Sequence, residues 1–381
     1  MSHHIVIGAG LAGAAAAYSL SARGEDVTML ERHTPANDRG SSHGSARIFR
    51  YAYPDRLYTE LVVRARGLWD GLEAESGTEL ITRTGAVDFG DARHTSLLAE
   101  IFEEVGVEHE VLDPARAAER WPQFVFDTEV LWHPDAGVID AETTVNVMLD
   151  RAESTGHARV LTDWTVTEVA RRSAGGFRVA SATGAVVEGD RVIVAAGGWL
   201  PDLLGDLGLP EGFLGALPRF EVRQEQAFHM PYRDADEDGR PSAPWPTFIH
   251  KSDDMFTYGL PGGRDAGFAG QKFAQFNGGK VIGSALDQDG QITEEMRTRM
   301  IDYAKRNLPG LIPEPYAETT CLFTNTTDED FVIDEVDGLV IVSACSGHGA
   351  KFAPLLGEFA ADLATGAGGV PERFRVGRSS R

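Results

Sequence analysis

Three glycines near the N-terminus have the spacing Gly-x-Gly-x-x-Gly, which suits the binding of a phosphate group. The largely apolar run 4–7 leads into Gly8, Gly10 and Gly13, and the Ala-rich segment 14–22 predicts a helix. A strand, tight turn and helix in this order direct backbone N–H groups and a helix N-terminus at a pyrophosphate. Gly8 permits the turn, Gly10 lets phosphates approach the backbone, and Gly13 lets the helix pack on the strand.

A carboxylate follows at the distance that nucleotide binding requires. Glu31 ends a second apolar strand, 26–30, and lies eighteen residues after Gly13. A carboxylate at this place can accept hydrogen bonds from both ribose hydroxyls of an adenosine. The glycines alone would also fit an ordinary turn, but strand, turn, helix and acid together predict dinucleotide binding.

The elements that must position these residues follow from hydrophobic periodicity. Apolar spacing predicts helices over 58–76, 95–105 and 140–155, the last of them starting from an Asp-x-x-Thr cap. From residue 158 the pattern changes to short strands, which we expect at 159–161, 165–170, 176–182, 185–188 and 191–194. Residues 216–300 predict further strands separated by Gly/Pro turns.

Composition limits the class of protein and its partners. A chain of 381 residues with 42% hydrophobic content can bury a large core and is expected to form two domains. No window approaches the roughly eighteen uninterrupted apolar residues of a membrane span, and two cysteines suit a reducing compartment, so we expect a soluble cytoplasmic protein. A net charge of −23 argues against nucleic acid or an anionic membrane as partner.

No metal site is expected. The acidic run 234–239 is interpreted as a solvated surface loop rather than a calcium site. Because the overall field of the protein repels anions, an anionic substrate would have to be held by local cations.

Four further motifs, together with the N-terminal glycines, resemble the monomeric sarcosine oxidase and N-methyltryptophan oxidase family of flavoenzymes. They are Ser42–Tyr53 (SHGSARIFRYAY), Gly270–Phe273 (GQKF), Cys321–Thr324 (CLFT) followed by Asp328–Asp334 (DEDFVID), and Ser346–Phe352 (SGHGAKF). The matches run in the family's order from residue 4 to residue 352, so the resemblance covers essentially the whole chain. It implies FAD as cofactor.

The resemblance implies a covalent bond from Cys321 to the 8α-methyl group of FAD. Such a thioether requires a thiolate, so the thiol must be partly exposed and near positive charge. The alternative for an unpaired cysteine is packing in the core. The CLFT motif favours the flavin bond for Cys321, whereas Cys345, which follows the apolar run 339–344, is predicted to pack.

Cations in these motifs imply sites for anions. Arg50 and Lys351 are the expected clamp for a substrate carboxylate, since a guanidinium assisted by a second cation recognises that group best. Arg47 is expected nearer the flavin ring, where its charge stabilises anionic reduced flavin, and Lys272 matches the lysine that assists reaction with oxygen. The alternative for any lone Arg or Lys is solvation, which we assign to Lys251 and Lys280.

His348 and a set of FAD contacts complete the expected catalytic and cofactor residues. His348 is expected over or beside the flavin, although a structural histidine in a Gly-rich turn is the alternative. The resemblance implies that FAD is contacted by Gly8, Gly10, Gly13, Glu31, Ser42, Arg47, Val166, Cys321, Gly347, Gly349 and Lys351.

Two departures from the family pattern bear on the substrate. Phe276 stands where sarcosine oxidases carry a histidine, and Phe323 where they carry a tyrosine. Loss of both polar groups predicts a more apolar pocket and argues against sarcosine itself. Tyr258 matches a tyrosine of the family's substrate pocket and remains available to donate a hydrogen bond or to stack.

The expected fold is α/β, with a glutathione-reductase-like FAD-binding domain of the GxGxxG Rossmann type and a second domain built on a mixed or antiparallel sheet. The predicted boundaries are 1–80, 150–215 and 320–381 for the first domain, and 81–149 and 216–319 for the second. In flavoproteins of this kind, a strand such as 191–194 that ends in small residues returns beside the phosphate-binding strand.

The function implied is oxidation of a secondary amino acid, N-methyl or cyclic, to an imine by a monomeric enzyme that passes electrons to O2 and forms hydrogen peroxide. Three alternatives stay open. They are an oxidase of proline- or pipecolate-like imino acids in secondary metabolism, a flavin amine dehydrogenase with another electron acceptor, and a catalytically silent FAD-binding protein.

Overall fold

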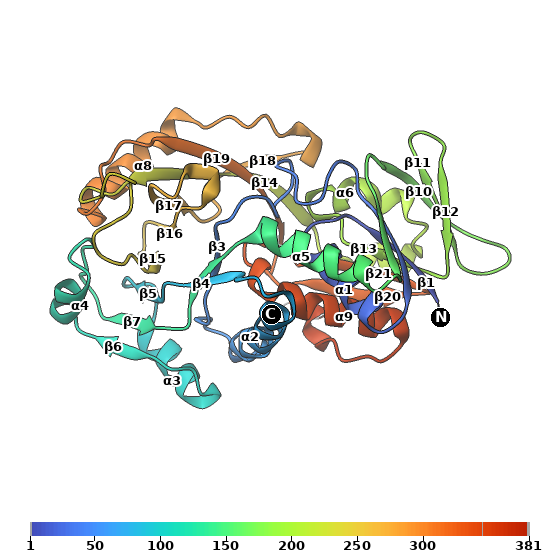
Figure 1. The fold of residues 1–381 in the computed structure, drawn as a ribbon, viewed down its shortest axis with the longest axis horizontal. Helices are drawn as coiled ribbons and strands as arrows, with labels where there is room; N and C mark the ends of the chain where they lie inside the picture. The colour runs from blue at the N-terminus through green and yellow to red at the C-terminus, as the bar shows by residue number, and fades with distance from the viewer. Residues whose placement is uncertain (1, 345, 379–381) are drawn as a thin grey trace.

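The computed structural model describes residues 2–344 and 346–378 of the chain. The molecule is elongated, with a mainly parallel sheet toward one end of its long axis and a larger mixed sheet toward the other (Figure 1). The predicted α/β fold class is confirmed, whereas the domain boundaries stay a prediction. Cys345, which was predicted to pack, lies outside the described residues.

The first sheet has six strands and contains the predicted phosphate-binding strand near its centre. Its order is β20 (Val332–Val336), β21 (Leu339–Ser343), β13 (Arg191–Val194), β1 (His3–Ile7), β2 (Asp26–Leu30) and β9 (Ala158–Leu161). All neighbours are parallel except β20 and β21. Strand β13 lies directly beside β1, as predicted, so both strands end at the same edge of the sheet.

One face of this sheet is covered by helices that approach one another closely. Helix α1 (Leu11–Ala22) contacts both α5 (Ala141–Ser154) and α9 (Ala353–Thr365). A Cβ atom at Gly357 would lie only 2.3 Å from the Ala15 carbonyl oxygen, so small residues are what let α1 and α9 meet. The side chain of Asp140 caps α5 by accepting from Thr143 N at 3.0 Å, as its Asp-x-x-Thr sequence predicts.

The second sheet is mixed, because β5 and β15 are parallel while its other neighbours are antiparallel. Its order is β18 (Lys280–Ile282), β14 (Phe220–Pro231), β17 (Gly270–Gln275), β16 (Phe256–Pro261), β15 (Thr247–Lys251), β5 (Ala86–Phe89), β7 (Val130–His133) and β6 (Glu110–Leu112), with β19 (Ala317–Thr326) beside β14.

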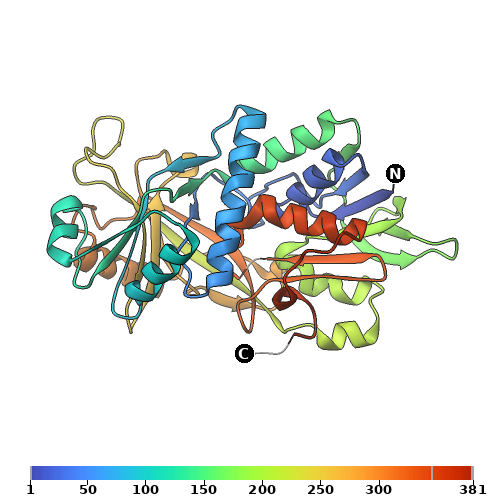
Figure 2. The ribbon, with the colours of Figure 1, turned by 90° about the horizontal axis from the view of Figure 1, so that it is seen from below.

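Two three-stranded sheets complete the strand structure. They are β10 (Val166–Arg171), β11 (Phe177–Ser181) and β12 (Val186–Gly189), and β3 (Arg47–Phe49), β8 (Gly137–Ile139) and β4 (Ile81–Arg83). The other helices are α2 (Arg56–Ser76), α3 (Thr95–Val105), α4 (Pro114–Arg120), α6 (Leu200–Leu203), α7 (Glu211–Ala216) and α8 (Glu294–Asn307). Figure 2 shows α2 crossing the molecule between its two ends.

The expectation of strands throughout 216–300 was wrong at its end, where α8 begins at Glu294. The helix buries only Met296, Met300, Tyr303 and Ala304, so its apolar stripe is narrow. Its start signal is local: the Thr293 hydroxyl accepts from Met296 N at 3.3 Å.

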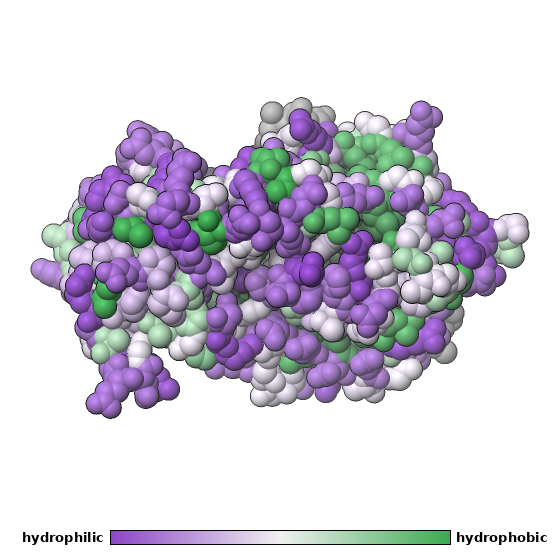
Figure 3. All heavy atoms as spheres, turned by 90° about the horizontal axis from the view of Figure 1, so that it is seen from above, coloured by the Kyte–Doolittle hydropathy of each residue, from purple (hydrophilic) through white to green (hydrophobic). Residues whose placement is uncertain are grey.

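Hydrophilic residues cover most of the face shown in Figure 3. The acidic run 234–239 is exposed along nearly all of its length, which fits its interpretation as a solvated loop. Within 2–344 and 346–378, no helix is long and apolar enough to cross a membrane, and no three His, Cys, Asp or Glu side chains are grouped to hold a metal ion.

A buried ionic network ties the second sheet to the segment that follows β3. Asp88 on β5 is fully buried, accepts from Arg93 Nε at 2.7 Å and lies 3.1 Å from His133 Nε2. Arg93 also donates to the carbonyl of Ala52 at 3.0 Å. Burial alone would raise the pKa of Asp88, but Arg93 and His133 hold it at about 2.

We predict that Asp88→Asn lowers the free energy of unfolding by about 3–5 kcal/mol, because it leaves the buried Arg93 charge without its counter-charge. Urea denaturation measures the change, and Asp238→Asn in the exposed acidic loop is the control. Because the folded-state pKa of Asp88 is depressed, its contribution is present above pH ~4 and is lost as pH falls toward 2. Equal stability of the two variants would contradict the assignment.

Candidate flavin and substrate site

Two cavities meet inside the molecule. The edge cavity, of about 440 Å³, lies at the carboxyl ends of β1, β2, β13 and β21 and is lined by Gly8, Glu31, Ser42, Ala195 and Ser343 among others. The sheet cavity, of about 300 Å³, lies over one face of the large sheet and is lined by Arg50, Tyr258, Lys272 and Lys351 among others. Both are lined by Arg47, Cys321, Phe323, Gly347, His348 and Ala350.

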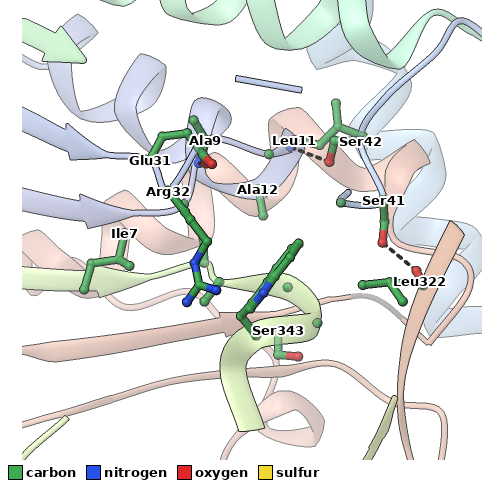
Figure 4. Close-up of a pocket in the computed structure, with 18 of the residues that line it drawn as sticks. Ile7, Ala9, Leu11, Ala12, Glu31, Arg32, Ser41, Ser42, Leu322 and Ser343 are labelled. Carbon is green, nitrogen blue, oxygen red and sulfur yellow. Dashed lines mark hydrogen bonds between the residues drawn. The ribbon is translucent and has the colours of Figure 1, made fainter. Parts of the chain in front are cut away.

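The glycine turn is built so that no side chain fits in it. Gly8 has φ +99°, and a Cβ atom there would lie 2.5 Å from the Ala195 carbonyl oxygen. A Cβ at Gly13 would lie 1.8 Å from the Gly8 carbonyl oxygen, so Gly13 serves packing and does not line the edge cavity. Leu11 N donates to Ser42 Oγ at 3.0 Å, which brings the 42–53 motif to the start of α1 (Figure 4).

Glu31 is buried beside this turn and is held by backbone donors. Its Oε2 atom accepts from Ala9 N and its Oε1 atom from His33 N, each at 2.8 Å. Figure 4 shows Glu31 beside Ala9. Asn37 Nδ2 donates to Oε1 at a longer 3.4 Å. An ionised carboxylate has about four acceptor positions, so Glu31 retains capacity for a ribose hydroxyl.

Two tryptophans in the edge cavity were not predicted from the sequence. The Nε1 atoms of Trp164 and Trp199 are buried and have no hydrogen-bond partner among the described residues. The Arg32 guanidinium lies 5.7 Å from the centre of the Trp199 ring. A cofactor rich in hydrogen-bond acceptors fits these donors, and the glycine turn and Glu31 fit its diphosphate and ribose.

The sheet cavity gathers side chains from one face of four neighbouring strands. The strand registers place on this face Ala227 of β14, Cys321 and Phe323 of β19, Lys272 of β17 and Tyr258 of β16. Phe276 packs against Phe256 and Phe323 with ring centres 4.7 and 5.8 Å apart, which forms an aromatic wall. The apolar pocket predicted from Phe276 and Phe323 therefore has a third member, Phe256.

Arg50 and Lys351 converge on one aromatic ring. The guanidinium carbon of Arg50 lies 4.6 Å and Lys351 Nζ lies 5.6 Å from the centre of the Tyr53 ring. Lys351 lies on the short helix η5 (Ala350–Phe352) and is 3% exposed. Its amine donates to the His348 carbonyl at 2.7 Å. Arg50 donates to the carbonyl of Ala52. Burial and the nearby Arg50 hold the pKa of Lys351 well below its usual range. An anion bound here would stabilise the charged form of Lys351 and so offset the effects of burial and of the Arg50 charge on its pKa.

Lys272 and Arg47 form a second group of cations near Cys321. Burial, aided by the charge of Arg47, lowers the pKa of Lys272 to about 8, although Asp265 and Cys321 act in the opposite direction. Arg47 is fixed by donating to the carbonyls of Ser41 at 3.1 Å and Ala46 at 2.9 Å. Cys321 is partly exposed, as a reactive thiol must be.

His348 makes the contacts of a structural histidine. Its Nδ1 atom lies 3.1 Å from the Tyr53 hydroxyl, and its Nε2 atom lies 3.0 Å from the carbonyl oxygen of Glu329. The ring stacks on Phe331, and burial lowers its pKa to about 3, so the imidazole is neutral. These contacts favour the interpretation of His348 as a structural histidine over a role beside the flavin.

The remaining expected residues divide between the cavities. Val166, Gly10 and Gly349 line the edge cavity, whereas Lys351, expected to contact the cofactor as well, lines only the sheet cavity. Lys251 is exposed but borders the sheet cavity, and Lys280 pairs with Asp289 at the surface. Sequence reasoning assigned no role to Tyr53, His43 or Arg93, which also line the sheet cavity.

Comparison with known proteins decides the family. The family described as "FAD dependent oxidoreductase" matches residues 3–363. N-methyl-L-tryptophan oxidase of Escherichia coli (strain SMS-3-5 / SECEC) is 33% identical over 375 residues, which cover 94% of each chain. The chain belongs to the FAD-dependent oxidoreductase family. The family predicted from the motifs is thus confirmed, and this oxidoreductase uses FAD.

Solved structures share the fold of this oxidoreductase. NikD, an unusual amino acid oxidase essential for nikkomycin biosynthesis, matches with a TM-score of 0.83 at 23% identity and covers 99% of this chain and 98% of its own. L-proline dehydrogenase from P. horikoshii matches with a TM-score of 0.80 at 22% identity, over 97% and 94% of the two chains.

We predict that Gly347→Ala reduces FAD binding by about 10-fold or more. A Cβ at Gly347 would lie 2.5 Å from the Phe323 ring and 2.6 Å from the Phe276 ring, at the junction of the cavities. Overpacking of this kind costs about 1–3 kcal/mol. Flavin bound per protein after purification is the measurement. Gly24→Ala is the matched control, because Gly24 also has positive φ (+80° against +71°) but no atom within 4 Å of its Cβ position. Equal flavin content in both variants would refute the packing argument.

Proposed function

We propose that this FAD-dependent oxidoreductase oxidises secondary amino acids, N-methyl or cyclic, to imines and transfers the electrons to O2, giving hydrogen peroxide. The observation that carries the proposal is the sheet cavity, which has the Arg50–Lys351 pair on one wall and aromatic rings on another, and which opens to the edge cavity at Cys321. FAD, when bound, supplies the acceptor for a hydride equivalent.

The protein's own contribution is to position the substrate. Arg50 and Lys351 hold the carboxylate, which orients the carbon next to the amine toward the junction of the cavities. The rings of Phe256, Phe276 and Phe323 exclude water from the apolar part of the substrate and favour an aromatic or cyclic amino acid. The named substrate of the Escherichia coli relative, N-methyl-L-tryptophan, has this combination of carboxylate, secondary amine and aromatic ring.

The second candidate substrate is a cyclic imino acid, which the same clamp would hold. L-proline dehydrogenase from P. horikoshii, which shares the fold, favours this second candidate. A panel of N-methyl and cyclic amino acids, assayed for peroxide, separates the two.

A monomeric, cytoplasmic state also stays a prediction, supported by the net charge of −23 and by the low cysteine content.

We predict that Arg50→Ala or Lys351→Met lowers kcat/KM by about 10²-fold or more for amino acids, because one of the two cations is lost from the carboxylate site. Amines without a carboxylate should lose this dependence, and Lys280→Met, which removes an exposed lysine, is the control. Wild type should prefer N-methyl aromatic or cyclic amino acids over sarcosine by about 1–3 kcal/mol in transition-state binding. Sarcosine as the best substrate, or full activity of both clamp variants, would rule out this site.

We predict that the flavin stays with the protein through acid precipitation, because Cys321 is proposed to form the thioether. The partly exposed thiol lies between the cavities, and its charge influences Lys272, so it meets both conditions for a reactive thiolate. Cys321→Ala should release the flavin into the acid supernatant, and Cys345→Ala should not. Flavin in the supernatant of the wild type would exclude the covalent bond.

We predict that reoxidation of the reduced enzyme by O2 slows as pH rises through about 8, where Lys272 loses its proton and its charge. Lys272→Met should slow reoxidation by about 10²–10³-fold with a small effect on anaerobic reduction, and Lys272→Arg should keep the rate at high pH. Stopped-flow absorbance measures the two half-reactions separately. Equal effects on both would make Lys272 a substrate-binding residue, and a wild type inert to O2 would favour the dehydrogenase alternative.

A further inference from the structure

A buried carboxyl group lies directly across the sheet from Cys321. Glu225 on β14 pairs with Cys321 on β19 in the antiparallel ladder, so their side chains emerge as neighbours on one face. Glu225 is 1% exposed. Its Oε2 atom accepts from Gly279 N at 3.1 Å, whereas Oε1 is buried without a hydrogen-bond partner among the described residues.

This face is the one that forms the sheet cavity. Ala227, two residues further along β14, lines the cavity, and strand alternation places Glu225 on the same side. Glu225 is not itself a lining residue, so it lies just behind the cavity wall. The strand registers also place Tyr258 on this face, and burial, Cys321 and Glu225 hold the pKa of Tyr258 well above its usual range.

The surroundings of Glu225 make it a proton acceptor that works near neutral pH. The charged and titratable groups that face it are Arg223 on its own strand, Cys321 on β19 and Tyr258 on β16. Arg223 is engaged elsewhere, since it donates to Glu221 at 2.6 Å and to the Gly279 carbonyl at 3.1 Å. Burial therefore prevails over Arg223 and the Gly279 N–H and raises the pKa of Glu225 to about 7.

We propose that Glu225 accepts the proton of the Cys321 thiol when the thioether to FAD forms. The inference rests on the covalent bond proposed above. In the net reaction, thiol, 8α-methyl group and O2 give thioether and hydrogen peroxide. The S–H and one C–H bond break, the S–C bond forms, and two electrons pass through the cofactor to O2. The Lys272 cation, on the same face, stabilises the thiolate while the bond forms.

The test follows attachment itself rather than turnover. Flavin-free protein is mixed with FAD in air, and acid-precipitable flavin is measured over time at a series of pH values. In the wild type the rate should rise with pH through about 7, where Glu225 ionises. Glu225→Gln retains an acceptor for Gly279 N–H but removes the base. It should slow attachment by about 10²-fold or more and abolish this pH dependence.

Two variants and one binding measurement separate the outcomes. Glu225→Asp retains a carboxyl group and should keep the pH dependence at a lower rate. Glu237→Gln, in the exposed acidic loop and away from Arg223, should behave as wild type. Equal attachment rates in wild type and Glu225→Gln overturn the inference alone, as does a loss explained by weaker non-covalent FAD binding in a fluorescence titration. No attachment in the wild type overturns the covalent bond and the inference together.

Discussion

Positive charge without an acidic partner is the constraint on which the site depends. This charge is buried at Lys272 and Lys351 and half-buried at Arg47 and Arg50. Among the described residues, no ion pair includes the cations around the junction of the cavities, which are Arg47, Arg50, Lys272 and Lys351. Main-chain carbonyls fix three of them in place but do not neutralise them. Arg93, by contrast, is paired with Asp88 and stabilises the fold. Charges held by carbonyls remain available to anions, so a substrate carboxylate and an electron-rich cofactor are the groups that complete the site.

The same constraint explains how a chain with a net charge of −23 can bind an anion. The acidic loop and most carboxylates lie at the surface, where water and salt screen them beyond about 8 Å. The cations lie in cavities enclosed by protein, so they act over short distances in a medium of lower dielectric constant than bulk water. Local charge, not the sum over the chain, therefore decides what the site attracts.

What could be predicted from the sequence is whatever a local pattern specifies. The turn at Gly8 and the cap at Asp140 are local chemistry, and the strand 191–194 is a buried apolar run, so all three were predicted correctly. Helix α8 was missed because its apolar stripe is narrow and its cap is a single threonine. Cys321 and Lys272 were predicted because they lie in specific motifs, and both line the sheet cavity. Trp164, Trp199 and Glu225 follow no local pattern, since their importance arises only where distant strands meet.

Strand β14 shows how the register between these distant strands is fixed. Its two faces have different tasks. Ala227 lines the cavity and Glu225 lies on the same face behind the cavity wall, while Gln224 and Gln226 face the segment before α8. The Gln224 side chain accepts from Asp289 N at 2.9 Å, and that of Gln226 accepts from Thr293 N at 2.6 Å. A slip of one residue would exchange the two faces, burying glutamines in the cavity and breaking these bonds. The amides on the outer face thus hold the register that places Glu225 opposite Cys321 on the inner one.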